Sequence, residues 1–194
     1  MKRFLFCIMM IAPLIFFSAC ATTAPRYMMF IENPTLNISL IKPENGKSAL
    51  VVARTTNFGG AVEFDTYLEK KMIGVTQGKS YFVKTDVNPG VSYVISKAEN
   101  MEPAKINFEP GRIYYLLQIP RMGVWRARIS VSLLTPGDLL STMDDGCKLL
   151  TYDTNHPGDD LSDDDYQKAV NDYEREIKEG LHKEYEGYRG VPAK

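Results

Sequence analysis

Residues 105–134 read KINFEPGRIYYLLQIPRMGVWRARISVSLL and carry the clearest secondary-structure signal in the chain. Within this stretch Ile106 and Phe108 alternate with polar neighbours, and so do the apolar residues of the run 129–133. Side chains of a β-strand point to opposite faces in turn, so alternation predicts strands with one buried and one wet face. Pro110 and Gly111 supply the turn that separates two of these strands. The stretch therefore predicts antiparallel sheet.

The same kind of pattern extends outward over most of the chain. Runs rich in Val, Ile, Tyr, Phe and Thr predict strands at 37–41, 48–54, 62–68, 71–75, 81–86, 91–97, 105–108, 112–119 and 127–134. Turn residues at 43–46, 57–60 and 88–90 separate them. Short strands at this spacing, without long helices between them, predict a mainly β fold and an antiparallel sandwich.

The C-terminal part of the chain has a different pattern. Ser162, followed by Asp165 three residues later, is a typical helix N-cap after an acidic linker. Apolar side chains then recur at spacings of three and four residues, which places them on one helix face: Tyr166, Val170, Tyr173, Ile177 and Leu181. We predict a C-terminal amphipathic helix over 163–186. Its apolar stripe is expected to pack on the sandwich, with binding to a partner as the alternative.

The first twenty residues have the layout of an export signal. A short basic segment precedes an apolar run at 4–17, which is too short for a spanning helix. The sequence Phe17-Ser18-Ala19-Cys20 resembles the lipobox of bacterial lipoproteins, in which the chain is cut before the cysteine and its thiol is acylated. The resemblance implies cleavage between Ala19 and Cys20, lipidation of Cys20 and anchoring to a lipid bilayer.

Three other interpretations of this segment stay open. Ordinary signal peptidase could use Ala19 and Ala21 and release a soluble periplasmic protein, the segment could stay uncut as an anchor, or Cys20 could be coincidental. By resemblance to enteric lipoproteins, Ala21 after the cysteine implies sorting to the outer membrane, with the protein facing the periplasm.

These patterns divide the chain into a signal peptide at 1–19, a lipidated cysteine and tether at 20–35, a β-sandwich domain at 36–152, and an acidic linker with a helix at 153–194. The content of 44% hydrophobic and 24% charged residues is that of an ordinary globular protein. Loss of the signal peptide removes two of the 23 basic side chains and leaves 21 against 24 acidic ones. A net charge of −3 disfavours a nucleic-acid partner.

Four short motifs together carry a family resemblance. They are an apolar run ending in arginine at 49–54, a hairpin at 62–74, Gly-Lys-Ser-Tyr-Phe at 78–82 followed by Asn-Pro-Gly at 88–90, and Gly-Arg-Ile-Tyr-Tyr at 111–115. In combination they resemble, over 48–134, the bacterial lipoproteins grouped as domain of unknown function 2846. Glu69-Lys70 stands where that family has Asp-Gly, which predicts a wider hairpin. The resemblance implies an Ig-like or transthyretin-like sandwich on a lipid anchor, and implies no activity, cofactor or site residue.

One basic cluster is a candidate binding site. Arg121, Trp125, Arg126 and Arg128 gather arginines around the only tryptophan of the chain. Guanidinium pairing and stacking suit an anionic partner such as lipid head groups or a cell-wall glycan. The simpler interpretation is a hairpin connection whose arginines stay solvated.

A second candidate is an acidic loop. Residues 153–164 partly resemble an EF-hand calcium loop, with ligand oxygens at Asp153 and Asn155 and Gly158 at the sixth place. Two further ligand places lack an oxygen, so an acidic linker that caps the next helix is the favoured interpretation. We expect no metal and no other cofactor.

The chain offers little for catalysis. His156 and His182 are its only histidines, and both lie outside the predicted sandwich. Cys147 lies in an alternating stretch and is interpreted as a buried apolar side chain. We expect a non-enzymatic envelope lipoprotein that acts as an interaction or structural module, possible partners being an envelope protein or a cell-wall glycan.

Two alternatives belong to other functional classes. A small-ligand or glycan-binding lipoprotein would use a cleft lined by aromatic side chains, namely Tyr81, Phe82, Tyr114 and Tyr115. A hydrolase of unrecognised type would place His156 in a cleft beside a serine or cysteine.

Overall fold

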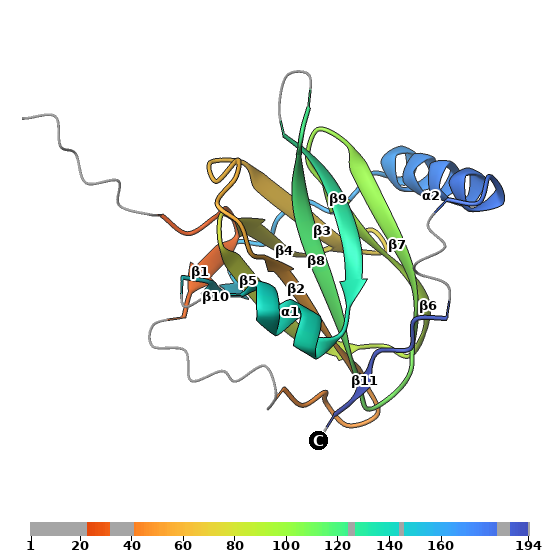
Figure 1. Ribbon diagram of the computed structural model, residues 1–194, viewed down its shortest axis with the longest axis horizontal. Helices are drawn as coiled ribbons and strands as arrows, with labels where there is room; N and C mark the ends of the chain where they lie inside the picture. The colour runs from red at the N-terminus through yellow and green to blue at the C-terminus, as the bar shows by residue number, and fades with distance from the viewer. Residues whose placement is uncertain (1–22, 32–40, 124–126, 144–145, 182–186, 194) are drawn as a thin grey trace, which may run out of the picture.

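The computed structural model describes residues 23–31, 41–123, 127–143, 146–181 and 187–193. These residues form a mainly β sandwich of two sheets, with one helix outside each sheet (Figure 1). The predicted fold class, a mainly β sandwich with a C-terminal helix, is therefore confirmed.

The larger sheet has seven strands. Its order is β1 (Met28–Phe30), β10 (Lys148–Tyr152), β5 (Ser80–Val87), β2 (Ser48–Arg54), β8 (Arg112–Met122) and β11 (Val191–Pro192), and β9 (Ala127–Leu134) also pairs with β8. The smaller sheet has the order β4 (Lys71–Gln77), β3 (Glu63–Leu68), β6 (Gly90–Lys97) and β7 (Met101–Phe108). All pairs in the smaller sheet are antiparallel.

Two strand pairs in the larger sheet are parallel, which the prediction of an antiparallel sandwich did not include. Strand β2 runs parallel to β8, and β10 runs parallel to β5. Between β2 and β8 the chain forms β3 and β4 in the smaller sheet, β5 in the larger sheet, and β6 and β7 in the smaller sheet, so β2 and β8 are not joined by a hairpin. Strand β2 is buried on both faces, which explains its uninterrupted apolar run.

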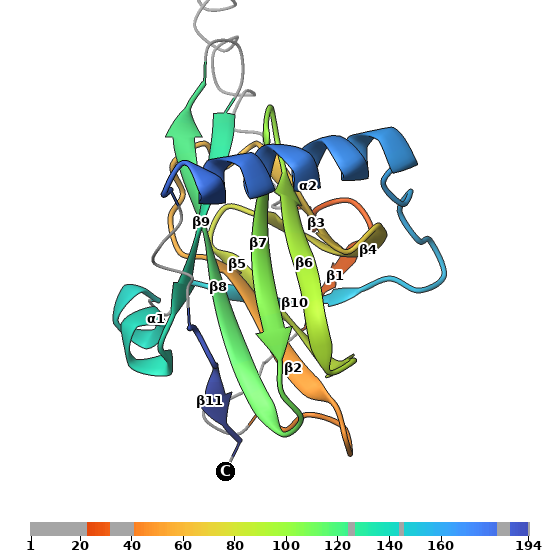
Figure 2. The same ribbon diagram turned by 90° about the vertical axis from the view of Figure 1, so that its right-hand side faces the viewer.

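The sandwich has two apolar cores. The first fills the space between the sheets and continues beneath α2 (Asp163–Lys178), with Phe64, Leu116 and Tyr173 among its buried members. The second lies outside the larger sheet, where Leu139 of α1 (Pro136–Thr142) packs on Val51 and its neighbours. Figure 2 shows α2 lying across β6 and β7, so the prediction that the helix packs on its own sandwich is confirmed.

Several predicted boundaries need correction. Pro25 is buried and β1 begins at Met28, so the tether predicted at 20–35 is too long. The helix predicted over 163–186 ends at Lys178, because Gly180 adopts a φ of 83° that breaks the helical path. The strand predicted at 37–41 lies outside the described residues except for Ile41, which is buried.

The hairpin between β3 and β4 is tighter than expected. Leu68 pairs with Lys71, which leaves only Glu69 and Lys70 in the turn, with Glu69 at a φ of 55°. The Glu69 carboxylate accepts hydrogen bonds from the backbone N–H of Tyr93, at 2.9 Å, and from the Tyr166 hydroxyl of α2. This glutamate therefore joins the turn, β6 and the helix. Among the residues that the structure places, no helix has the length and apolar content to cross a membrane.

Candidate functional site

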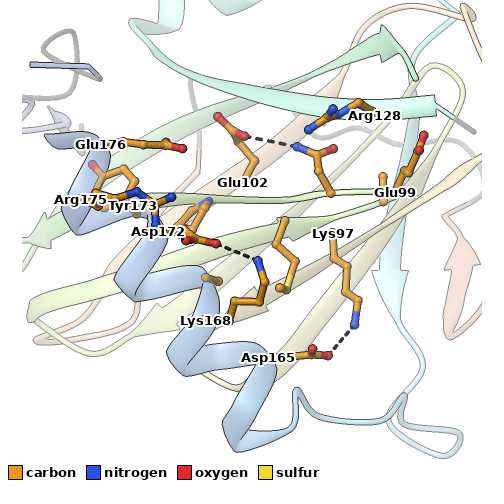
Figure 3. Close-up of a pocket in the computed structure, with 15 residues that line it drawn as sticks. Lys97, Glu99, Glu102, Arg128, Asp165, Lys168, Asp172, Tyr173, Arg175 and Glu176 are labelled. Atoms are coloured by element: carbon orange, nitrogen blue, oxygen red, sulfur yellow. Dashed lines mark hydrogen bonds and ion pairs between the residues drawn. The ribbon is translucent and has the colours of Figure 1, made fainter. Parts of the chain in front are cut away.

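A groove of about 540 Å³ runs between α2 and the turn that joins β6 to β7 (Figure 3). One wall is the turn with the adjoining ends of β6 and β7, residues 97–103, and the other is the face of α2 between Asp165 and Glu176. Arg128 of β9 closes the groove at the edge of the larger sheet. The groove therefore joins three segments that are distant in the sequence.

The groove depends on how α2 is fixed to the smaller sheet. Tyr173 is 2% exposed and meets the ring of Tyr93 edge to face at a centroid distance of 6.0 Å. The Tyr93 hydroxyl donates to Glu174, whose carboxylate also pairs with Lys105 Nζ at 2.6 Å. Burial, followed by the bond to Glu174, raises the pKa of Tyr93, while Lys105 and Tyr93 lower the pKa of Glu174. Apolar packing and a charged network thus hold α2 against the smaller sheet.

The groove is lined by charges of both signs. Asp172 pairs with Lys168 and Arg175, each at 2.8 Å, and these partners lower the pKa of Asp172. Lys97 pairs with Asp165 at 3.0 Å across the groove entrance. Such side chains can bind and orient a polar ligand that carries both acidic and basic groups. Neither a histidine nor a cysteine is among the lining residues in the part of the chain that the structure describes.

Replacing Tyr173 with alanine is expected to release α2 from the sandwich. Loss of a buried ring costs about 3 kcal/mol, which raises the population of the detached helix roughly a hundredfold. Limited proteolysis should then cut the chain within 153–181 much faster than in the wild type, while circular dichroism keeps the β signal. Ile177→Ala is the matched control because Ile177 is 39% exposed. Wild-type cleavage rates in the Tyr173 variant would contradict this account of helix docking.

The structure brings together two members of the predicted basic cluster. Arg121 of β8 pairs in register with Arg128 of β9, and both side chains are exposed. Arg121 Nε donates to Ser130 Oγ at 3.0 Å, and Arg128 also lines the groove. Trp125 and Arg126 lie outside the described residues. Sequence reasoning thus found one side chain of the groove, but not the α2 face opposite it.

A layer of polar side chains is buried between the sheets. Gln118 of β8 is 1% exposed, and its Nε2 donates to Thr66 Oγ1 and Ser96 Oγ, both at 2.9 Å. Its Oε1 accepts from the Thr76 hydroxyl. One amide of the larger sheet therefore contacts three strands of the smaller sheet. Each of these four side chains is buried, so a ligand in solution cannot reach this layer.

Arg54 is buried next to this layer, at the end of β2. It is fully buried, and its guanidinium donates to the carbonyls of Phe58, Gly59 and Val62 at 2.7–2.8 Å. The cation also lies 4.3 Å from the Phe64 ring centroid. Desolvation lowers the pKa of Arg54 to about 10, and its Nε has no hydrogen-bond partner. The sequence prediction placed Arg54 at a strand end without assigning it this role.

The acidic loop behaves as a linker in the structure. Asp153 accepts from the backbone N–H of Asn155 at 2.9 Å and contacts His156 Nδ1 at 2.8 Å. Asp160 accepts from Met72 N at 3.1 Å, and the Ser162 hydroxyl caps α2, as predicted. Within the described residues, no group of three His, Cys, Asp or Glu side chains is placed to hold a metal.

The aromatic cleft is not present. The four aromatic side chains predicted to line it are 0–5% exposed and belong to the two cores: Tyr81, Phe82, Tyr114 and Tyr115. They stabilise the fold because strand alternation directs each of them into a packed layer. Cys147 is half-buried against the second core, and the exposed His156 is held by Asp153. His182 lies outside the described residues.

Comparison with known proteins gives one relative. The chain is similar to an uncharacterized protein of Haemophilus influenzae strain Rd, with 29% identity over 109 residues. The match covers 56% of this chain and 62% of the relative, so the chain spans less than two thirds of that protein. No family model and no solved structure matches. The resemblance to domain of unknown function 2846, and the lipobox, therefore stay predictions.

Proposed function

We propose that this protein is a lipid-anchored bacterial envelope protein, attached through an acylated Cys20 and facing the periplasm from the outer membrane. The order of basic segment, apolar run, small residues and Cys20 carries the proposal. Four residues of sequence separate Cys20 from Pro25, which is buried in the folded domain, and this short spacing supports the proposal.

We further propose that the sandwich is a non-enzymatic interaction module. The groove beside α2 offers ion-paired side chains for recognition, and Arg121 and Arg128 add basic charge on the adjacent strand edge. These groups suit binding of a charged protein or glycan of the envelope more than bond-breaking chemistry.

The test of the anchor is labelling of growing cells with a radioactive or clickable palmitate. The wild-type protein is expected to take up label, and Cys20→Ala is expected to take up none. Cys7→Ala and Cys147→Ala are the matched controls and should be labelled like the wild type, because only the lipobox cysteine is acylated. Mass spectrometry should find a mature chain that begins at acylated Cys20. A mature chain starting after Ala21, or equal labelling of Cys20→Ala, would contradict the proposal.

A second candidate function is binding of a small polar ligand or glycan, and the volume of the groove favours it. Soluble peptidoglycan fragments carry carboxylates and amines, which match the mixed charges of the groove. Isothermal titration should give saturable binding that weakens about tenfold in Arg128→Ala, since one charge-assisted hydrogen bond is lost. Arg121→Ala is the control outside the groove. Equal binding by wild type and Arg128→Ala would reject this candidate.

A further inference from the structure

The residues after Cys20 connect almost at once to the folded domain. Pro25 is buried and its carbonyl accepts from Met28 N at 3.1 Å, while Arg26 pairs with Glu63 and Asp65. Five residues of extended chain span at most about 17 Å. If Cys20 is acylated, the domain is held with the Thr23 end close to the lipid surface.

Residues near Thr23 belong to one end of the sandwich. Thr23 and Pro25 line a hollow of about 380 Å³ together with the β2–β3 loop, at Asn57 and Gly60, and the β4–β5 turn. A Cβ on Gly59 of that loop would lie 3.7 Å from the Cβ of Ala127, the first residue of β9. Figure 1 shows the N-terminal segment at the left of the molecule and the upper ends of β8 and β9 at its top.

This end of the sandwich exposes large apolar side chains next to basic ones. Phe58 is 50% exposed at the tip of the β2–β3 loop, and Met122 is 83% exposed at the end of β8. Arg121 and Arg128 are exposed on the adjoining strand pair. Exposed apolar side chains beside basic charge are what the interface of an anionic bilayer binds.

We propose that Phe58, Met122, Arg121 and Arg128 form a lipid-facing surface that rests on the bilayer in which Cys20 is anchored. This inference depends on the proposed lipid anchor and adds the orientation of the domain. The apolar side chains enter the interface, and the two arginines contact anionic phosphates.

The test uses the full acylated protein in vesicles whose lipids carry bromine on the acyl chains. Trp125 is the only tryptophan and lies three residues after Met122, so its fluorescence reports on the hairpin. Contact with the interface should quench this fluorescence by about half relative to vesicles without bromine. The double variant Phe58→Ser, Met122→Ser should lose most of the quenching. Val91→Ser, a 59% exposed residue at the opposite end of the sandwich, should retain it.

The arginines are tested by changing the lipid. Quenching in the wild type should increase when phosphatidylglycerol is added to phosphatidylcholine vesicles, and the variant Arg121→Gln, Arg128→Gln should show no such increase. Acylated protein whose tryptophan is not quenched overturns the inference while the anchor stands. Protein that carries no acyl group would instead contradict the proposed lipid anchor. The palmitate label and the mass of the mature chain detect this outcome before any quenching is measured.

Discussion

Replacing Arg54 with alanine is expected to destabilise the sandwich by about 3–5 kcal/mol. The guanidinium donates the hydrogen bonds to three carbonyls of the 58–62 segment and lies over the Phe64 ring. The alanine variant leaves these carbonyls without a donor and opens a cavity at the end of β2. Urea unfolding, followed by circular dichroism, measures the change in the free energy of unfolding.

The matched control is Arg54→Met, which keeps an apolar stem of similar length. It loses the hydrogen bonds but also removes the desolvation of a charge, which already lowers the pKa of Arg54 to about 10. The methionine variant should therefore lie between the wild type and the alanine variant in stability. A loss below about 1 kcal/mol in both variants would mean that the segment 58–62 finds its hydrogen bonds elsewhere.

Strand positions could be predicted because the signal is local. Eight of the predicted strands overlap β2 to β9, since alternation and turn residues act within one segment, although the strand predicted at 105–108 covers only the second half of β7. Strand pairing is not local, which is why the parallel contacts of β2 with β8 were missed. The short strands β1 and β11 contain three and two residues, too few for any periodicity. Helix α1 was also missed, although Thr135 and Pro136 are a typical helix start.

The candidate groove could be predicted only in part. Arg128 was identified from its charge, but the face of α2 that lies opposite depends on where the helix docks. The burial of two polar side chains could have been predicted from the alternation of their strands. Arg54 continues the inward parity of Leu50 and Val52 on β2, and Gln118 continues that of Tyr114 and Leu116 on β8. The polar side chains of Arg54 and Gln118 suggested exposure to solvent, whereas their positions in the alternation of each strand predicted that they point into the core.

Because Gln118 points into the core, the variant Gln118→Glu is expected to be strongly destabilised at neutral pH. The introduced carboxyl is surrounded by buried hydroxyls of the smaller sheet: Thr66, Thr76 and Ser96. Desolvation should raise its pKa to about three units above the usual 4.3, which corresponds to roughly 3 kcal/mol of lost stability at pH 7. Urea unfolding at pH 7 measures this loss.

The pH dependence separates this charge effect from simple loss of the amide. In the variant the folded state binds a proton more tightly than the unfolded state, so its stability relative to the wild type should fall as the pH rises above about 4. Gln118→Leu, which cannot titrate, should lose about 2–3 kcal/mol through the unpaired hydroxyls at every pH. A difference between wild type and Gln118→Glu that stays constant from pH 4 to about pH 7 would show that the carboxyl reaches water. In that case the layer between the sheets would be open to solvent and accessible to a ligand.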